Sequence, residues 1–141
     1  LAQAAEESGW GTSRFVLEGN ALFGQWTFAG TQNLIPTRRD AGRSHEVKAF
    51  TNLLDAVRAY MHNLNTHRAY RKFRAMREKM RLTARPADGL ALVGSLTNYS
   101  VRGKKYIRSI RAIITTNRLL ALDKTRLGGK LVKPPSSKPA I

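Results

Sequence analysis

The N-terminal segment of the chain ends in a turn that its glycines dictate. Residues 1–6 read LAQAAE, and their alanines, the strongest helix formers, predict a helix. Residues 7–11 read ESGWG, and Gly9 is the residue type that most often ends a helix in a left-handed conformation. We therefore expect a helix that ends near Gly9, with Glu7 in its last turn and Trp10 in the turn that follows.

A carboxyl group held rigidly beside an aromatic ring suits the cleavage of a glycosidic bond. That reaction needs a carboxylic acid in a partly desolvated place, where its pKa rises enough to keep a proton near neutral pH. It also benefits from a flat ring on which a sugar can stack. Glu7 would supply the acid and Trp10 the ring. The structural alternative is that Glu7 is a surface residue beside a helix-ending glycine and that Trp10 belongs to the core.

Three motifs, in order along the chain, resemble those of one family. ESGWG at residues 7–11 is followed by NALFG at residues 20–24, and LTNYS at residues 96–100 is followed by a second tyrosine, Tyr106, two helical turns after Tyr99. Together they resemble glycoside hydrolase family 73, the bacterial peptidoglycan N-acetylglucosaminidases, and most closely its Bax-type branch. The likeness covers roughly residues 1–120.

The resemblance implies a lysozyme-like enzyme that cleaves the β-1,4 bond on the reducing side of N-acetylglucosamine in peptidoglycan. It implies Glu7 as the general acid, and it puts a second acidic residue on a β-hairpin, where Glu46 and Asp40 are the candidates. We prefer Glu46, within a strand, because Asp40 lies in a turn where Asp is common for backbone reasons. The second carboxylate would be a nucleophile or a base that orients water, unless the acetamido group of the substrate is the nucleophile.

Aromatic and polar residues near the motifs are candidates for substrate binding. The set comprises Trp10, Asn20, Phe23, Trp26, Tyr99 and Tyr106. Trp26 lies in a polar stretch and is the better stacking candidate, whereas Trp10 and Phe23 fit a core position equally well. The motif match puts Tyr99 in the cleft, and Asn20 either holds a loop or contacts an acetamido group.

The apolar spacing predicts a mainly α (α+β) fold with one small β-hairpin lobe. Residues 11–35 mix Gly, Asn, Thr and aromatics, which predicts loop. Alternation predicts strands at residues 34–39 and 45–50, joined by a turn at residues 40–44. In the second strand Val47 would lie on the face opposite Glu46.

Four further helical segments follow the hairpin. The first begins at Thr51 or Asn52, and its helical spacing predicts a buried stripe made of Leu53, Leu54, Val57, Tyr60, Met61 and Leu64. After a break at residues 65–66, a second helix runs to the Arg85-Pro86 step, and a short helix begins near Asp88. The last helix carries Tyr106, Ile107, Ile110, Ile113, Ile114 and Leu120.

These segments predict a catalytic domain over residues 1–125 and a flexible basic tail over residues 126–141, which is rich in Pro, Ser and Lys. The chain starts inside a predicted helix, so we expect its N-terminus to be truncated. We expect no membrane span, because no apolar run reaches about 18 residues. We expect no cofactor and no metal, because the histidines lack ligand spacing. The resemblance implies the periplasm or cell envelope.

The formal net charge of +16, from 25 Lys and Arg against 9 Asp and Glu, predicts a polyanionic partner. Peptidoglycan strands and other anionic envelope polymers would meet the basic faces, of which the largest is made by Arg68, Arg71, Lys72, Arg74, Arg77, Lys79, Arg81 and Arg85. We expect no specific nucleic acid, because the aromatics cluster near the carboxylate motif and not among the arginines. The alternatives are a non-catalytic wall-binding protein and a basic helical nucleic-acid-binding module.

Overall fold

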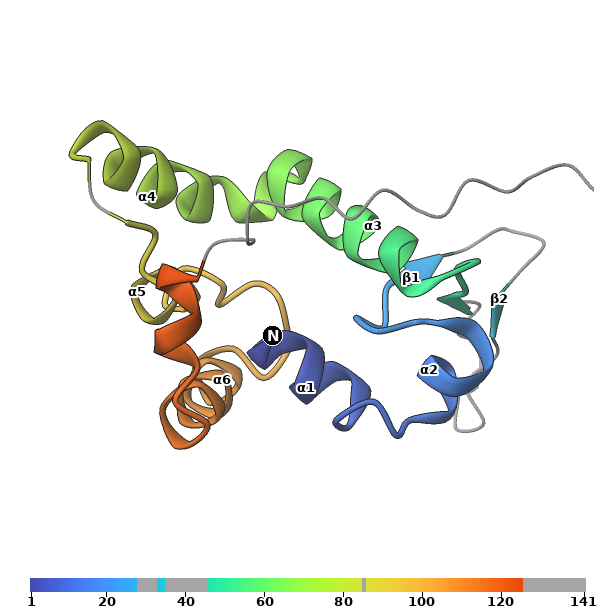
Figure 1. The fold of residues 1–141 in the computed structure, drawn as a ribbon. Coiled ribbons are helices and arrows are strands. Elements are labelled where there is room, and N and C mark those ends of the chain that lie inside the picture. The colour runs from blue at the N-terminus through green and yellow to red at the C-terminus, as the bar shows by residue number, and fades with distance from the viewer. Residues whose placement is uncertain (28–32, 35–45, 85, 126–141) are drawn as a thin grey trace, which may run out of the picture.

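The computed structural model describes residues 1–27, 33–34, 46–84 and 86–125. Over these residues the fold is mainly helical with a small sheet at one end, as predicted (Figure 1). Its elements are α1 (Ala2–Ser8), α2 (Arg14–Gly19), β1 (Trp26–Thr27), β2 (Asn33–Leu34), β3 (Glu46–Lys48), α3 (Leu53–Thr66), the 3₁₀ helix η1 (Arg68–Tyr70), α4 (Arg71–Leu82), α5 (Gly89–Val93), α6 (Lys104–Thr116) and the 3₁₀ helix η2 (Leu119–Lys124). The predicted tail and the predicted turn at residues 40–44 lie outside the described residues.

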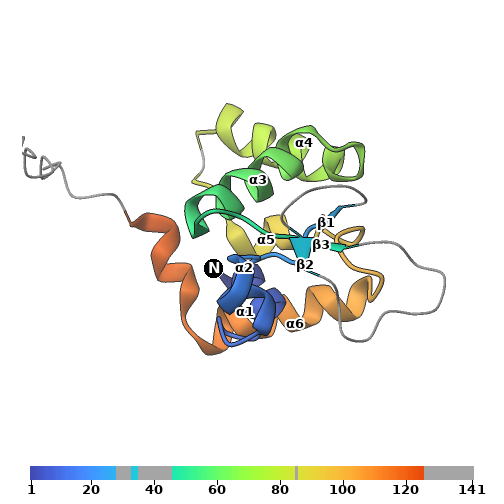
Figure 2. The ribbon, with the colours of Figure 1, turned by 90° about the vertical axis from the view of Figure 1, so that its right-hand side faces the viewer.

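The core lies where α1 and α5 pack against α6. Figure 2 shows α3 and α4 along one side of the molecule and α6 along the other, with α1 and α5 between them. The apolar residues of α6 recur three and four positions apart, so Ile107, Ile110 and Ile114 face the same way and are buried. Leu96 and Tyr106 complete this core next to the start of α1. The α1 helix is therefore anchored along one side, which matters for the residues in its last turn.

Three predicted helix boundaries are confirmed. The α1 helix ends at Ser8 with Gly9 in the left-handed conformation, at φ 58°. The side chain of Asn52 accepts a hydrogen bond from the backbone N–H of Asp55 at 2.9 Å, and that of Asp88 accepts one from Ala91 at 3.0 Å. These short polar side chains satisfy N–H groups that the first turn of a helix leaves unpaired.

The segment predicted to be an ordered loop contains a short helix and a strand that were not predicted. Ser13 accepts a hydrogen bond from the backbone N–H of Val16 and begins the six-residue helix α2. This helix is too short to show a helical period in the sequence. The β1 strand, which also falls in this segment, pairs with β3 through Trp26 and Val47.

The predicted hairpin is one side of a three-stranded antiparallel sheet. Its strand order is β1-β3-β2, and Leu34 pairs with Val47, three residues from the Phe50 that a turn at residues 40–44 would put opposite it. The prediction missed β1, which occupies the other edge of β3. Val47 is buried while Lys48 is exposed, so the alternation predicted for this strand holds.

The predicted buried stripe of α3 is partly wrong. Leu53, Leu54 and Met61 are exposed, whereas Ala56 and Leu64 are buried. The protein covers only the narrow face of α3 that contains Ala56, Tyr60 and Leu64, spaced four residues apart. A stripe of apolar residues can therefore extend beyond the part of a helix that packing covers.

The two later helices end earlier than predicted. The α4 helix ends at Leu82, before the Arg85-Pro86 step, and none of its residues is fully buried. Its arginines are not all free surface charges: Arg74 donates to the backbone carbonyls of Leu64 and His67, at 3.1 and 2.9 Å. The α6 helix ends at Thr116, so Leu120 lies in η2 and not in the last α-helix.

Candidate active site

Glu7 lies in the last turn of α1, directly before a backbone turn with three successive positive φ values. Gly9, Trp10 and Gly11 have φ of 58°, 59° and 82°. The hydroxyl of Ser8, which is buried, accepts a hydrogen bond from the backbone N–H of Gly11 at 2.8 Å and fixes this turn. Trp10 is 64% exposed, so the core alternative for this residue is wrong and its ring faces solvent.

Four tyrosines surround Glu7, each from a different part of the chain. Tyr60 comes from α3, Tyr70 from η1, Tyr106 from α6, and Tyr99 from the loop before α6. Burial raises the pKa of all four hydroxyls, and the negative charge of Glu7 raises each of them further. The sequence contains 4 tyrosines in total, so every tyrosine of the protein belongs to this cluster.

The rings of the cluster contact one another. Tyr99 stacks on Tyr106 with ring centroids 5.5 Å apart, and it lies 6.3 Å from Tyr60 and 6.0 Å from Tyr70. Phe23 extends the cluster by stacking on Tyr60 at 4.0 Å. The result is a largely buried aromatic cluster whose hydroxyl groups lie near one carboxylate.

The environment of Glu7 favours its protonated form. Burial is the largest effect and raises the pKa of this carboxyl group above its ordinary value, and the nearby charge of Glu6 raises it further. A hydrogen bond from Tyr106 and the positive charge of Arg102 act in the opposite direction. Since burial dominates, Glu7 keeps its proton to a higher pH than an exposed glutamate, as a general acid must.

Gln3 connects two of the tyrosines and was missed by the sequence analysis. The hydroxyl of Tyr60 donates to Oε1 of Gln3 at 2.5 Å, and Nε2 of Gln3 donates to the hydroxyl of Tyr106 at 2.9 Å. Gln3 precedes Glu7 by four residues, so the two lie on the same face of α1. That spacing is the signal that could have identified Gln3.

Glu6 points away from Glu7, as their separation of one position on the helix predicts. Its carboxylate pairs with Arg102 at 2.8 Å and accepts a hydrogen bond from the hydroxyl of Ser109 at 3.0 Å. Arg102 also lies over the ring of Tyr106, 5.8 Å from its centroid. Glu6 therefore connects α1 to α6 and places a positive charge beside the tyrosine cluster.

The remaining predicted site residues are Phe23, Asn20, Trp26, Glu46 and Asp40. Phe23 is buried and stacks on Tyr60, which is the core position given as one of its two alternatives. Asn20 donates to the backbone carbonyl of Phe50 at 3.0 Å, which supports its loop-holding alternative. Trp26 belongs to β1, and Glu46 is half-buried on β3. The side chain of Trp26 and all of Asp40 lie outside the described residues.

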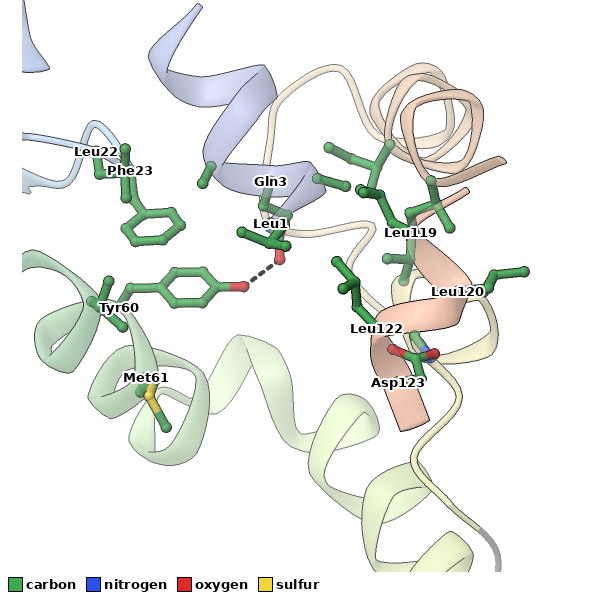
Figure 3. A pocket seen from close by; sticks show the side chains of 17 residues that line it. Leu1, Gln3, Leu22, Phe23, Tyr60, Met61, Leu119, Leu120, Leu122 and Asp123 are labelled. Atoms are coloured by element: carbon green, nitrogen blue, oxygen red, sulfur yellow. Dashed lines mark hydrogen bonds between the residues drawn. The ribbon is translucent and has the colours of Figure 1, made fainter. Parts of the chain in front are cut away.

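An apolar cavity of about 460 Å³ is lined in part by Gln3. Figure 3 shows Tyr60 and Gln3, joined by their hydrogen bond, on its wall, together with Phe23 and leucines of η2. Glu7 does not line it. This cavity is therefore separate from the carboxylate, and it shares Tyr60 and Phe23 with the tyrosine cluster.

Two kinds of feature are absent from the part of the chain that the structure describes. There, no group of three or more His, Cys, Asp or Glu side chains is placed to hold a metal ion. Within the same ranges, no helix combines the length and the apolar character that crossing a membrane requires.

Comparison with known proteins agrees with the motifs. A family model for glucosaminidases, described as mannosyl-glycoprotein endo-β-N-acetylglucosaminidase, matches residues 1–119. Protein bax of Escherichia coli (strain K12) is 35% identical over 117 residues, which are 83% of this chain and 41% of that protein. The chain thus spans less than half the length of this relative. No solved structure matches the chain significantly. The chain belongs to the glucosaminidase family, glycoside hydrolase family 73, and resembles its Bax-type members.

Proposed function

We propose that this chain is the catalytic domain of a peptidoglycan hydrolase of the periplasm or cell envelope. It cleaves the β-1,4 bond on the reducing side of N-acetylglucosamine, with Glu7 as the general acid. The observation that carries the proposal is the position of Glu7: a carboxyl group with a pKa raised by burial, at the end of an anchored helix and inside a cluster of four tyrosines.

In this mechanism Glu7 donates its proton to the glycosidic oxygen of the leaving sugar. The bond from that oxygen to the anomeric carbon breaks, and positive charge develops on the N-acetylglucosamine ring. Glu46 assists as nucleophile or as a base that orients water, with Asp40 as the second candidate for this role. Water finally adds to the anomeric carbon and leaves N-acetylglucosamine at the new reducing end.

The aromatic residues bind the glycan strand. The exposed ring of Trp10 offers a stacking face beside Glu7, and Trp26 is proposed as a second one. Tyr99 is the proposed cleft residue of the pair, and the buried ring of Tyr106 packs against it with its hydroxyl next to the acid. Phe23 stacks on the ring of Tyr60, and Asn20 holds the backbone of Phe50 in place.

A second candidate function is wall binding without catalysis. The charges that act on the pKa of Glu7 come from Glu6 and Arg102, both at the α1–α6 side of the molecule. Neither residue belongs to the sheet that carries Glu46, so the proposed second carboxylate is not among the charges that act on Glu7. A hydrolase that used the acetamido group of its substrate would fit the same observation, so cleavage itself has to be measured.

Digestion of purified peptidoglycan, followed by reduction of the new ends and identification of the reduced sugar, tests the proposal. Reduced N-acetylglucosamine supports it, and reduced muramic acid would show a muramidase instead. If a folded protein binds the wall but releases no sugar, the wall-binding function replaces the hydrolase. The Glu7→Gln variant is the matched control for every digestion.

A further inference from the structure

The side-chain amide of Gln3 lies between two tyrosine hydroxyls in the interior of the protein. It accepts from Tyr60 through Oε1 and donates to Tyr106 through Nε2. Gln3 is only 7% exposed and Tyr106 only 1%, so water has little access to the hydrogen bond between them. The proposed mechanism uses Glu7 and Tyr106 but gives Gln3 no role.

The chemistry of these groups fixes the direction of each hydrogen bond. An amide NH₂ group only donates, and a phenol carries one proton and accepts through its oxygen. The oxygen of Tyr106 accepts from Gln3, so the single proton of Tyr106 has to point to another partner. The carboxylate of Glu7 is the partner: it lies one helical turn after Gln3 on the same face of α1, and the pKa values of Glu7 and Tyr106 both respond to a hydrogen bond between them. Tyr60 donates its proton to Oε1 of Gln3, and this hydrogen bond keeps the amide in one orientation.

We propose that Gln3 is a positioning residue: its amide orients the hydroxyl of Tyr106 so that this hydroxyl donates to the carboxylate of Glu7. The inference deepens the proposed function and rests on it for the role of Glu7 as general acid. A donated hydrogen bond stabilises the ionised form of a carboxyl group. Gln3 therefore limits how far burial raises the pKa of Glu7, and keeps it a strong enough acid to release its proton.

Other groups that act on Glu7 set the background for this effect. They are the charges of Glu6 on α1 and Arg102 before α6, whereas for Tyr60, Tyr70 and Tyr99 the charge of Glu7 is what acts on the tyrosine hydroxyls. Among these described groups only Tyr60 hydrogen-bonds the amide of Gln3, and it does so at Oε1, not at the Nε2 that donates to Tyr106. An effect of Gln3 on the pKa of Glu7 that passes through Tyr106 can therefore be separated from the effects of these other groups by combining a substitution of Gln3 with one of Tyr106.

The test is a double-mutant cycle with the titration of the Glu7 carboxyl carbon as its readout, measured by NMR on the substrate-free protein. Gln3→Glu keeps the shape of the side chain but replaces the NH₂ donor with an acceptor, which draws the proton of Tyr106 away from Glu7. We expect the pKa of Glu7 to rise by about one unit from the lost hydrogen bond, in addition to the effect of the new charge. In the Tyr106→Phe background only the effect of the charge should remain.

Gln3→Met is the matched uncharged variant, and it serves alone if Gln3→Glu does not fold. It fills a similar volume without a donor, so we expect a smaller rise that disappears in the Tyr106→Phe background. Equal shifts with and without the Tyr106 hydroxyl would overturn the proposal for either variant. A merely structural role for Gln3 predicts that equality.

Kinetics separate this inference from the proposed function. A general acid must be protonated, so a higher pKa moves the alkaline fall of kcat/KM to higher pH. If the titrations show coupling but peptidoglycan is not cleaved, the role of Gln3 in orienting Tyr106 stands and the hydrolase proposal fails. If the protein cleaves peptidoglycan and the titrations show no coupling, the inference about Gln3 fails alone.

Discussion

The two sides of the molecule that carry the proposed acidic residues are built differently. Glu7 stands on a helix packed against α6, among side chains as completely buried as Ile110, Leu96 and Tyr106. Glu46 stands on a strand of three residues, in which only Val47 is buried. The first side dehydrates and orients its carboxyl group, whereas the second has little core of its own to do so.

This difference in burial fits the chemical role proposed for each of the two carboxyl groups. A general acid depends on a raised pKa, and a raised pKa depends on a rigid and partly dry environment. A carboxylate that stabilises positive charge or orients water acts in its ionised form, so it can remain exposed to solvent. The predictions below test whether the two sides differ in function as they differ in construction.

The largest effect is expected for Glu7→Gln. The amide keeps the shape of the side chain and loses the proton that the leaving sugar needs, so turnover of peptidoglycan should fall by about 10²- to 10⁴-fold. Release of reducing ends measures it, with circular dichroism as the check on folding. Activity within a few-fold of the unmodified protein would exclude Glu7 as the acid.

A smaller loss is expected on the sheet side. Glu46→Gln should reduce turnover by roughly 10²-fold at most, and Asp40→Asn should reduce it less. The same reducing-end assay ranks the two, and the larger loss identifies the second carboxylate. If both variants keep full activity, the acetamido group of the substrate becomes the better candidate for the nucleophile.

The burial of Glu7 also predicts a pH-dependent gain in stability for Glu7→Gln. The pKa of Glu7 is higher in the folded than in the unfolded protein, so ionisation costs stability as the pH rises above the ordinary carboxyl range. The amide avoids this cost. We expect Tm to rise by a few degrees at pH 7 and to stay unchanged near pH 4, in calorimetry or thermal circular dichroism. An equal change at both pH values would contradict a desolvated carboxyl group.

The smallest effect on chemistry is expected for the basic face of α4. Arg71, Lys72 and Lys79 are exposed, and reversing all three to Glu should weaken adsorption to intact walls at low salt. Such charges are screened beyond about 8 Å at physiological salt, so cleavage of a short soluble muropeptide should barely change. Arg74→Glu is the contrasting control, because Arg74 holds the end of α3 and its loss should lower Tm. Tight, structure-selective binding of RNA or DNA, abolished by the triple reversal, would favour a nucleic-acid module.

The sequence predicts the local parts of this site and misses its long-range parts. Gly9 and the cap residue Asn52 act within a few residues, so their roles follow from local backbone chemistry. Tyr60 fits an apolar helical stripe, and no local rule says that its hydroxyl meets Gln3 across 57 positions. The contact between Gln3 and Tyr106 spans 103 positions and depends on how α1 packs on α6. Tyr70 carried no local signal at all.

The gathering of all 4 tyrosines around Glu7 makes this residue type a natural spectroscopic label. Tyrosine labelled with a stable isotope would give NMR signals from the tyrosine cluster alone, with no background from the rest of the protein. The hydroxyl pKa values are raised, so these rings stay protonated across the useful pH range and do not obscure the titration of the acid. Contact with a glycan fragment, and the protonation of Glu7, could thus be followed in the unmodified chain without an engineered probe.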